Sequence, residues 1–133
     1  LDENTMIPLA NPANRQGRQV ADVISGYRRR NRGAIGTAIV RVFDLSAASL
    51  GLNERQLKAA GRNFKAVHVT ANDHAGYFPG ATSIYMKMLF DPEEGTIFGA
   101  QGVGQKGVDK RIDILATAIK GNLKVDDLME LEF

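Results

Sequence analysis

The feature that most constrains the fold is a strand–turn–strand pattern in residues 83–103. Residues 83–90 alternate in polarity, which predicts a strand with Ile84, Met86, Met88 and Phe90 pointing inward. Residues 91–95 contain the late glycine of a hairpin loop, and residues 96–103 are predicted to pair back as the next strand. Because a tight hairpin joins antiparallel strands, the chain is predicted to form an antiparallel sheet.

Other segments extend this sheet and add helices. Gly99 and Gly102 in the second hairpin strand indicate close packing or a bulge. Asn53 is predicted to begin a helix through a capping box with Gln56. Further strands are predicted at residues 37–43, 46–50 and 64–70, and further helices at residues 108–119 and 126–132. The predicted fold class is α+β, with an antiparallel sheet of about five strands and helices on one face.

The N-terminal part is predicted to hold a separate helix. Asn11 suits the N-cap, Pro12 the first helical position and Gly26 the helix end. Small and apolar residues share one face of this helix: Ala13, Gly17, Val20, Ala21 and Ile24. An arginine-rich run at residues 28–32 follows, so we predict a domain boundary between residues 1–32 and residues 33–133.

Composition excludes several classes of function. The 133 residues include no cysteine, which rules out disulfides and thiolate catalysis within this chain. The two histidines have no metal-ligand spacing, so no metal site is predicted. The net charge of +2 is too small to indicate nucleic acid, and the arginine run is predicted to be an exposed linker. The alternative for the run is a contact for an anionic ligand or for RNA.

Neither a membrane span nor a secretory signal is predicted from this sequence. No apolar run could span a bilayer, and the acidic N-terminus does not resemble a secretory signal, so we expect a cytoplasmic protein without a membrane partner. The chain opens at Leu1 and has its first methionine at Met6, so we expect it to be a piece of a longer protein.

The most suggestive chemical feature is the loop at residues 74–80. His74 and Tyr77 on one loop can serve proton transfer or contact a substrate. The alternative is a surface loop that Tyr77 and Phe78 anchor to the domain. The glycine-rich residues 99–107 lack the spacing of nucleotide-binding loops, and we find no self-sufficient catalytic constellation in the chain.

Three stretches together resemble one family. Residues 7–18, IPLANPANRQGR, resemble the last flavin-side segment of FAD-dependent pyridine nucleotide-disulfide oxidoreductases. Residues 36–45 resemble the first strand of their C-terminal dimerisation domain, and residues 90–92, 99–101 and 107–113 resemble its closing hairpin and helix. The loop at residues 74–80 is similar to that of coenzyme A-disulfide reductases and the related coenzyme A persulfide reductases.

This resemblance implies a homodimeric parent enzyme that reduces a coenzyme A disulfide or persulfide with NAD(P)H through FAD. It implies that Tyr77 is a catalytic residue that enters the partner subunit's site, with His74 and Tyr77 contacting substrate. Family members often have Tyr-Tyr-Pro where this chain has Tyr77-Phe78-Pro79. Residues 1–32 would then close an FAD-binding domain, with the flavin approached by Pro8, Leu9 and Ala10.

The same resemblance limits what the chain does alone. The reactive cysteine and both nucleotide-binding folds of the family precede this region, so the isolated chain is expected to be inactive. An interface domain of an NADH oxidase or peroxidase, or a purely structural interaction module, are the alternatives.

Overall fold

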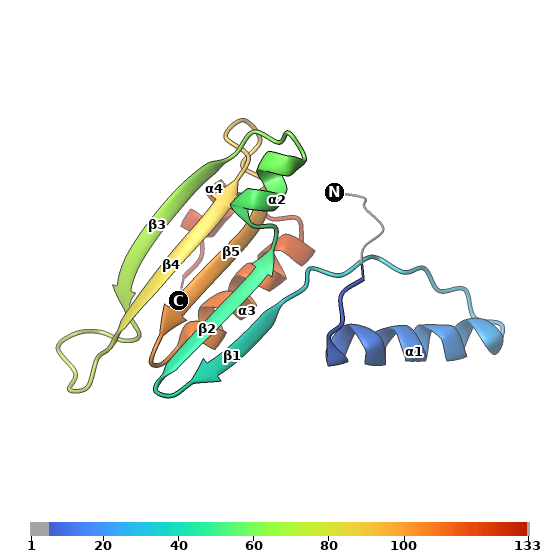
Figure 1. Cartoon of the computed structure of the whole chain (residues 1–133), viewed down its shortest axis with the longest axis horizontal. Helices are drawn as coiled ribbons and strands as arrows, with labels where there is room; N and C mark the ends of the chain where they lie inside the picture. The colour runs from blue at the N-terminus through green and yellow to red at the C-terminus, as the bar shows by residue number, and fades with distance from the viewer. Residues whose placement is uncertain (1–5, 133) are drawn as a thin grey trace. The chain divides into compact units, whose positions relative to one another are not determined.

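The computed structural model describes residues 6–132, and the chain divides into two compact units, Leu1–Gly36 and Thr37–Phe133 (Figure 1). The second unit holds one antiparallel sheet in the order β1-β2-β5-β4-β3. Its strands are β1 (Ala38–Val42), β2 (Leu45–Gly51), β3 (Lys65–Asn72), β4 (Ser83–Phe90) and β5 (Ile97–Gly104). Its helices are α2 (Glu54–Ala59), α3 (Val108–Lys120) and α4 (Val125–Met129). The predicted α+β class with a five-stranded antiparallel sheet is confirmed.

The central strand β5 is built for close approach. A Cβ added at Gly99 would lie 2.2 Å from the carbonyl oxygen of Leu52, so a side chain there would collide with backbone. A Cβ added at Gly102 would lie 2.6 Å from Sδ of Met86 and 3.2 Å from the side chain of Val108. The close packing predicted from these two glycines is confirmed, and it lets α3 lie directly on the sheet.

The face of the sheet under α3 holds most of the core. Gly104 lies beside Val108 of α3, and its strand partner Ile84 shares its face of the sheet. Ala100, four residues before Gly104 on β5, lies on the same face, and both Ile84 and Ala100 are buried. The helix contributes Val108, Ile112 and Ala118, all buried. Apolar burial of this kind is the main favourable term in folding.

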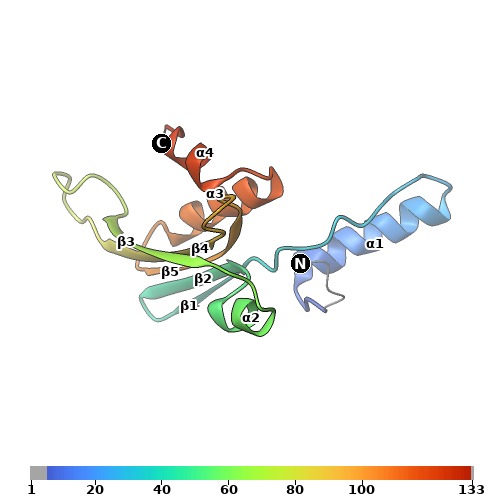
Figure 2. The same ribbon diagram turned by 90° about the horizontal axis from the view of Figure 1, so that it is seen from above.

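The short helix α2 adds cover on the other face. Lys87, whose side chain alternates with those of Ile84 and Met86, forms an ion pair with Glu54 of α2. Leu57 of α2 is fully buried, and the predicted capping box between Asn53 and Gln56 is present. Figure 2 shows α2 on the opposite side of the sheet from α3. The predicted placement of helices on one face holds for α3 and α4, whereas α2 lies on the opposite face.

Part of this second face is left uncovered. Val40 on β1, Val103 on β5 and Tyr85 on β4 lie in one register row that crosses the sheet through Ala47. Their exposed fractions are 56%, 40% and 60%. A row of apolar side chains open to solvent is typical of a surface that another part of an assembly covers.

Within the described residues 6–36, the first unit holds one helix, α1 (Ala10–Ile24), which begins earlier than predicted. Leu9, in an extended conformation, is the N-cap, so the prediction of Asn11 was wrong. Pro12 is the third helical residue. Proline is tolerated there because the amides of the first helical turn have no carbonyl partner within the helix. The predicted end is confirmed: Gly26 has φ +89°, and the amide of Tyr27 donates to the carbonyl of Asp22 at 2.9 Å.

The predicted apolar face of α1 is exposed. Val20 and Ile24 are 58% and 82% exposed, whereas Pro12, Arg15, Gln19 and Asp22 are the half-buried positions. Surface helices normally bury their apolar stripe, so this face is suited to contact with another part of a larger protein. Within residues 6–132, no helix has both the length and the apolar character needed to cross a membrane.

We expect Gly99→Ala to destabilise the second unit by about 3 kcal/mol, because the added methyl group would meet backbone atoms that cannot move independently. Chemical denaturation followed by circular dichroism measures this loss. Gly17→Ala is the matched control: a Cβ there meets nothing within 4 Å, so it should leave the stability of the second unit unchanged. Equal stability of Gly99→Ala and the unmodified chain would contradict the tight packing of β5.

Candidate functional site

The loop that joins β3 to β4, residues 73–82, carries both His74 and Tyr77 and extends past the ends of these strands (Figure 1). Its base is closed by two hydrogen bonds between the first and last residues. The amide of Asp73 donates to the carbonyl of Thr82 at 2.9 Å, and the amide of Thr82 donates to Oδ1 of Asp73 at 2.6 Å. The β3–β4 loop therefore starts from a fixed pair of residues.

The helix α3 ties this base to the core. Arg111 donates from Nη2 to the carbonyl oxygen of Asp73 at 3.1 Å. Gly107, the N-cap of α3, has φ +72°, and a Cβ there would lie 3.4 Å from both Cβ of Asp73 and Nη1 of Arg111. The left-handed conformation and the lack of a side chain both favour glycine at this position. The start of α3 is thus held against the base of the β3–β4 loop.

His74 forms a dyad with the preceding residue. Its Nδ1 lies 3.0 Å from Oδ2 of Asp73, whose side chain is only 8% exposed, whereas the His74 side chain is 37% exposed. The amide of Thr82, followed by His74, holds the pKa of the Asp73 carboxyl at about 2, below its usual 3.8. A carboxylate on Nδ1 fixes the orientation of the imidazole ring, and Nε2 makes no hydrogen bond to the residues that the structure describes.

Tyr77 lies at the exposed tip of the β3–β4 loop. Its side chain is 85% exposed and that of Phe78 is 59% exposed, with ring centroids 4.9 Å apart at an interplanar angle of 40°. The alternative in which these aromatic rings anchor the loop to the domain does not match this exposure. The loop is anchored instead at Asp73, and it presents the Tyr77 phenol outward.

Sequence reasoning missed Asp73 and Arg111 as residues that organise this loop. Arg111 is 38 positions from Asp73, so no local pattern reveals their contact. The adjacency of an aspartate and a histidine at the end of a predicted strand was the available signal for the dyad.

The residues expected to approach a flavin, Pro8, Leu9 and Ala10, belong to the first unit and immediately precede or begin α1. Leu9 is half-buried, and Pro8 and Ala10 are exposed. The first turn of α1 contains no acidic residue, and the helix start has no side-chain cap. Its backbone amides therefore supply unneutralised positive potential, which fits the negatively charged ring edge of a reduced flavin.

No group of three or more histidine, cysteine, aspartate or glutamate side chains within residues 6–132 could hold a metal ion. The sequence has neither a cysteine nor a dinucleotide fingerprint. The features that the structure does offer are the start of α1 and the exposed tyrosine of the β3–β4 loop.

The fold and these features together define a class of protein. Residues 37–132 match the family described as "Pyridine nucleotide-disulphide oxidoreductase, dimerisation domain". The chain belongs to this family.

The chain is also similar to individual proteins within this family. The chain is 38% identical, over 133 residues, to the coenzyme A disulfide reductase of Staphylococcus aureus (strain bovine RF122 / ET3-1), covering 99% of this chain and 30% of the relative. It is 52% identical to reduced Bacillus anthracis CoADR-RHD, with a TM-score of 0.97, covering 99% of this chain and 24% of that one. It is 40% identical to an NAD-dependent persulfide reductase from A. fulgidus, with a TM-score of 0.94, covering 98% and 24%. The chain thus spans less than a third of these relatives.

We expect stability to depend on pH through Asp73. Because the folded pKa of this carboxyl is about 2 and its ordinary value is 3.8, its contribution is complete above about pH 4 and is lost as the pH falls through about 2. In Asp73→Asn this acid-sensitive contribution is absent. Urea unfolding at about pH 5 and about pH 2.5 should therefore show a smaller acid-induced loss in the variant than in the unmodified chain.

The control for this experiment is Asp44→Asn, which removes an exposed carboxylate in the β1–β2 turn. It should lose as much stability at low pH as the unmodified chain does. An Asp73→Asn variant with the same acid-induced loss as Asp44→Asn would contradict the proposed anchoring of the loop base.

Proposed function

We propose that this chain is the interface region of a homodimeric FAD- and NAD(P)H-dependent reductase for a coenzyme A disulfide or persulfide, and that it contributes Tyr77 to the partner subunit's active site. The observation that carries the proposal is the exposure of Tyr77 on a loop whose base is firmly held. A side chain presented in this way on a dimerisation domain is suited to entering a site on another subunit. The identities to a coenzyme A disulfide reductase and a persulfide reductase support the substrate class.

The chemistry assigned to Tyr77 is proton donation. In the overall reaction, NAD(P)H and a proton convert one disulfide into two thiols and leave NAD(P)⁺. Bound FAD would carry the two electrons from the nicotinamide to the sulfur centre. The sulfur–sulfur bond breaks with a thiolate as leaving group, and the Tyr77 phenol donates a hydrogen bond or a proton to that thiolate.

His74 is proposed to contact substrate beside Tyr77. Its ring is oriented by Asp73 through Nδ1, so Nε2 can meet a polar group of the substrate. Pro8, Leu9 and Ala10 are proposed to meet the flavin of their own subunit, where the start of α1 stabilises negative charge on the reduced ring. Residues 1–32 are accordingly proposed to be the last segment of an FAD-binding domain, residues 33–133 the interface domain, and the protein cytoplasmic.

In the parent enzyme, Tyr77→Phe should lower turnover with coenzyme A disulfide by about a hundredfold, because a proton donor is lost. NADH consumption measures this. Tyr85→Phe is the matched control, since Tyr85 is also exposed but lies on the sheet, and it should keep full activity. Turnover with oxygen or peroxide alone, unaffected by Tyr77→Phe, would instead indicate an oxidase or peroxidase.

A mixed dimer tests whether Tyr77 acts on the partner subunit. One subunit carries Tyr77→Phe, and the other lacks the reactive cysteine of the parent enzyme. If Tyr77 serves the partner, the mixed dimer keeps one complete site and regains about half of the unmodified activity per dimer, whereas either variant homodimer is impaired. Activity no higher than that of the two homodimers would show that Tyr77 acts within its own subunit and would contradict this part of the proposal.

Dimerisation of the parent is expected to require residues 37–132. Analytical ultracentrifugation should give a dimer for the full-length enzyme and a monomer when this segment is removed, and the chain of residues 1–133 should not oxidise NADH with any disulfide. His74→Ala in the full-length enzyme is the control and should remain dimeric. A dimer without residues 37–132 would assign dimerisation to another region.

A further inference from the structure

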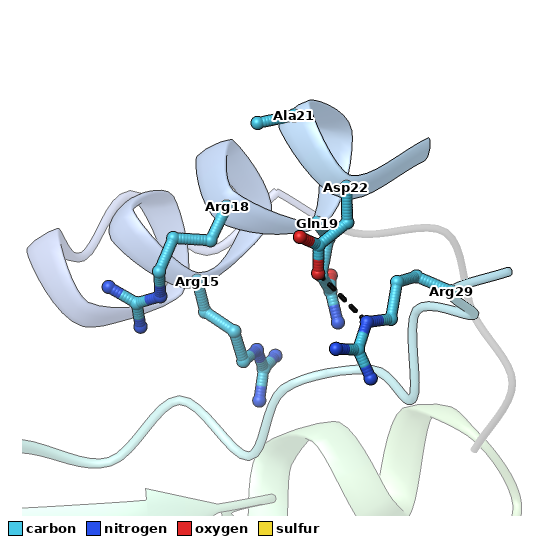
Figure 3. A pocket seen from close by; sticks show the side chains of 6 residues that line it. All are labelled: Arg15, Arg18, Gln19, Ala21, Asp22 and Arg29. Carbon is cyan, nitrogen blue, oxygen red and sulfur yellow. Dashed lines mark hydrogen bonds and ion pairs between the residues drawn. The ribbon is translucent and has the colours of Figure 1, made fainter. Parts of the chain in front are cut away.

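The arginines at the N-terminal end of the chain line a hollow within the first unit. Its volume is about 440 Å³, and it lies between α1 and the segment that follows this helix (Figure 3). The lining residues are Arg15, Arg18, Gln19, Ala21, Asp22 and Arg29. The lining thus includes three arginines and a single carboxylate.

The interactions inside this hollow neutralise only part of the positive charge of its three arginines. Arg29 donates from Nε to Oδ2 of Asp22 at 2.8 Å, so the carboxylate in the hollow is paired with Arg29. Arg15 donates from Nη2 to the carbonyl of Gly33 at 2.5 Å, but its Nε is buried without a hydrogen-bond partner. Among the residues that the structure describes, Arg18 makes no hydrogen bond or ion pair.

A purely structural role explains only part of this arrangement. Arg15 and Arg29 tie the connecting segment to α1, so both could be present for that purpose alone. Arg18 connects no two segments within residues 6–132, yet it lines the same hollow. Buried guanidinium N–H groups normally have partners, and Nε of Arg15 has none among the residues that the structure describes.

We propose that this hollow is a phosphate-binding site for a phosphomonoester or pyrophosphate group. Guanidinium groups bind phosphate oxygens through paired, charge-assisted hydrogen bonds, and three of them can satisfy several oxygens together. The neighbouring Arg28 and Arg30 add positive potential that attracts such an anion. Coenzyme A carries both kinds of phosphate group, and its selection as the natural ligand rests on the proposed function. The expected binding of pyrophosphate is independent of the proposed function.

Isothermal titration calorimetry on the chain of residues 1–133 tests the site, first with inorganic pyrophosphate and then with coenzyme A. We expect saturable binding of one pyrophosphate per chain. Arg18→Gln combined with Arg29→Gln should weaken it about tenfold, the loss expected for a charge-assisted hydrogen bond. Arg18→Gln alone should also weaken binding while leaving the helical circular dichroism signal unchanged, because Arg18 holds no part of the fold together.

Arg55→Gln is the control, since it removes one exposed arginine from α2 and should not affect binding. Equal weakening by Arg55→Gln, or no saturable binding of pyrophosphate, would overturn the site. Competition between pyrophosphate and coenzyme A would support coenzyme A as a source of the phosphate. Binding of pyrophosphate alone would keep the phosphate site but overturn its assignment to coenzyme A, without bearing on the role of Tyr77. Stronger binding of single-stranded RNA, lost in the same variants, would overturn the small-ligand proposal.

Discussion

The organisation of the second unit depends on how closely other groups approach the glycines of β5. Because Gly102 has no side chain, Val108 reaches the sheet, and the first turn of α3 lies directly on the central strand. Gly107 then allows that turn to meet Asp73. The consequence is that Arg111 can reach the carbonyl of Asp73, 38 positions earlier in the chain. The packing of the core thereby fixes the base of the loop that carries Tyr77.

This connection matters because the tip and the base of the β3–β4 loop have opposite requirements. Under the proposal that its phenol acts in another subunit, Tyr77 must be exposed, so it is not held by packing in its own domain. An exposed loop without fixed ends loses conformational entropy on binding, which reduces the affinity or the rate that it can provide. Hydrogen bonds at Asp73, Thr82 and Arg111 limit that cost while leaving the tip exposed.

Local signals predicted most of the second unit, and non-local contacts account for what they missed. The capping box at Asn53 and the close packing at Gly99 and Gly102 depend on short-range residue chemistry, which a sequence displays directly. The start of α1 was misplaced because Asn11 and Pro12 suit an N-cap and a first helical position, whereas proline is tolerated throughout the first turn. On the opposite face, α2 buries Leu57 and pairs Glu54 with Lys87, and a strand pattern does not reveal such contacts between elements.

The candidate site also combines residues that the sequence indicated with residues whose role depends on non-local contacts. His74 and Tyr77 could be named from the sequence because the loop resembles those of a known family, whereas the role of Asp73 depends on Thr82 and on a helix distant in sequence. The hollow beside α1 shows the same limit, because an arginine-rich sequence does not reveal which guanidinium groups already have partners. Arg29 is engaged with Asp22, and Arg15 is only partly satisfied. The arrangement of partners around each charge therefore distinguishes a candidate binding site from a solvated run.

The exposed apolar faces of the two units are suited to contact with other protein surfaces. In α1 the polar positions Arg15, Gln19 and Asp22 are the half-buried ones, while Val20 and Ile24 are open to solvent. An isolated helix of this length gains little stability by itself, so it normally depends on burial of its apolar stripe. The row from Val40 to Tyr85 leaves the sheet with a similar uncovered surface. A chain that spans less than a third of its relatives would leave such surfaces exposed if the remainder of the protein and a second subunit normally cover them.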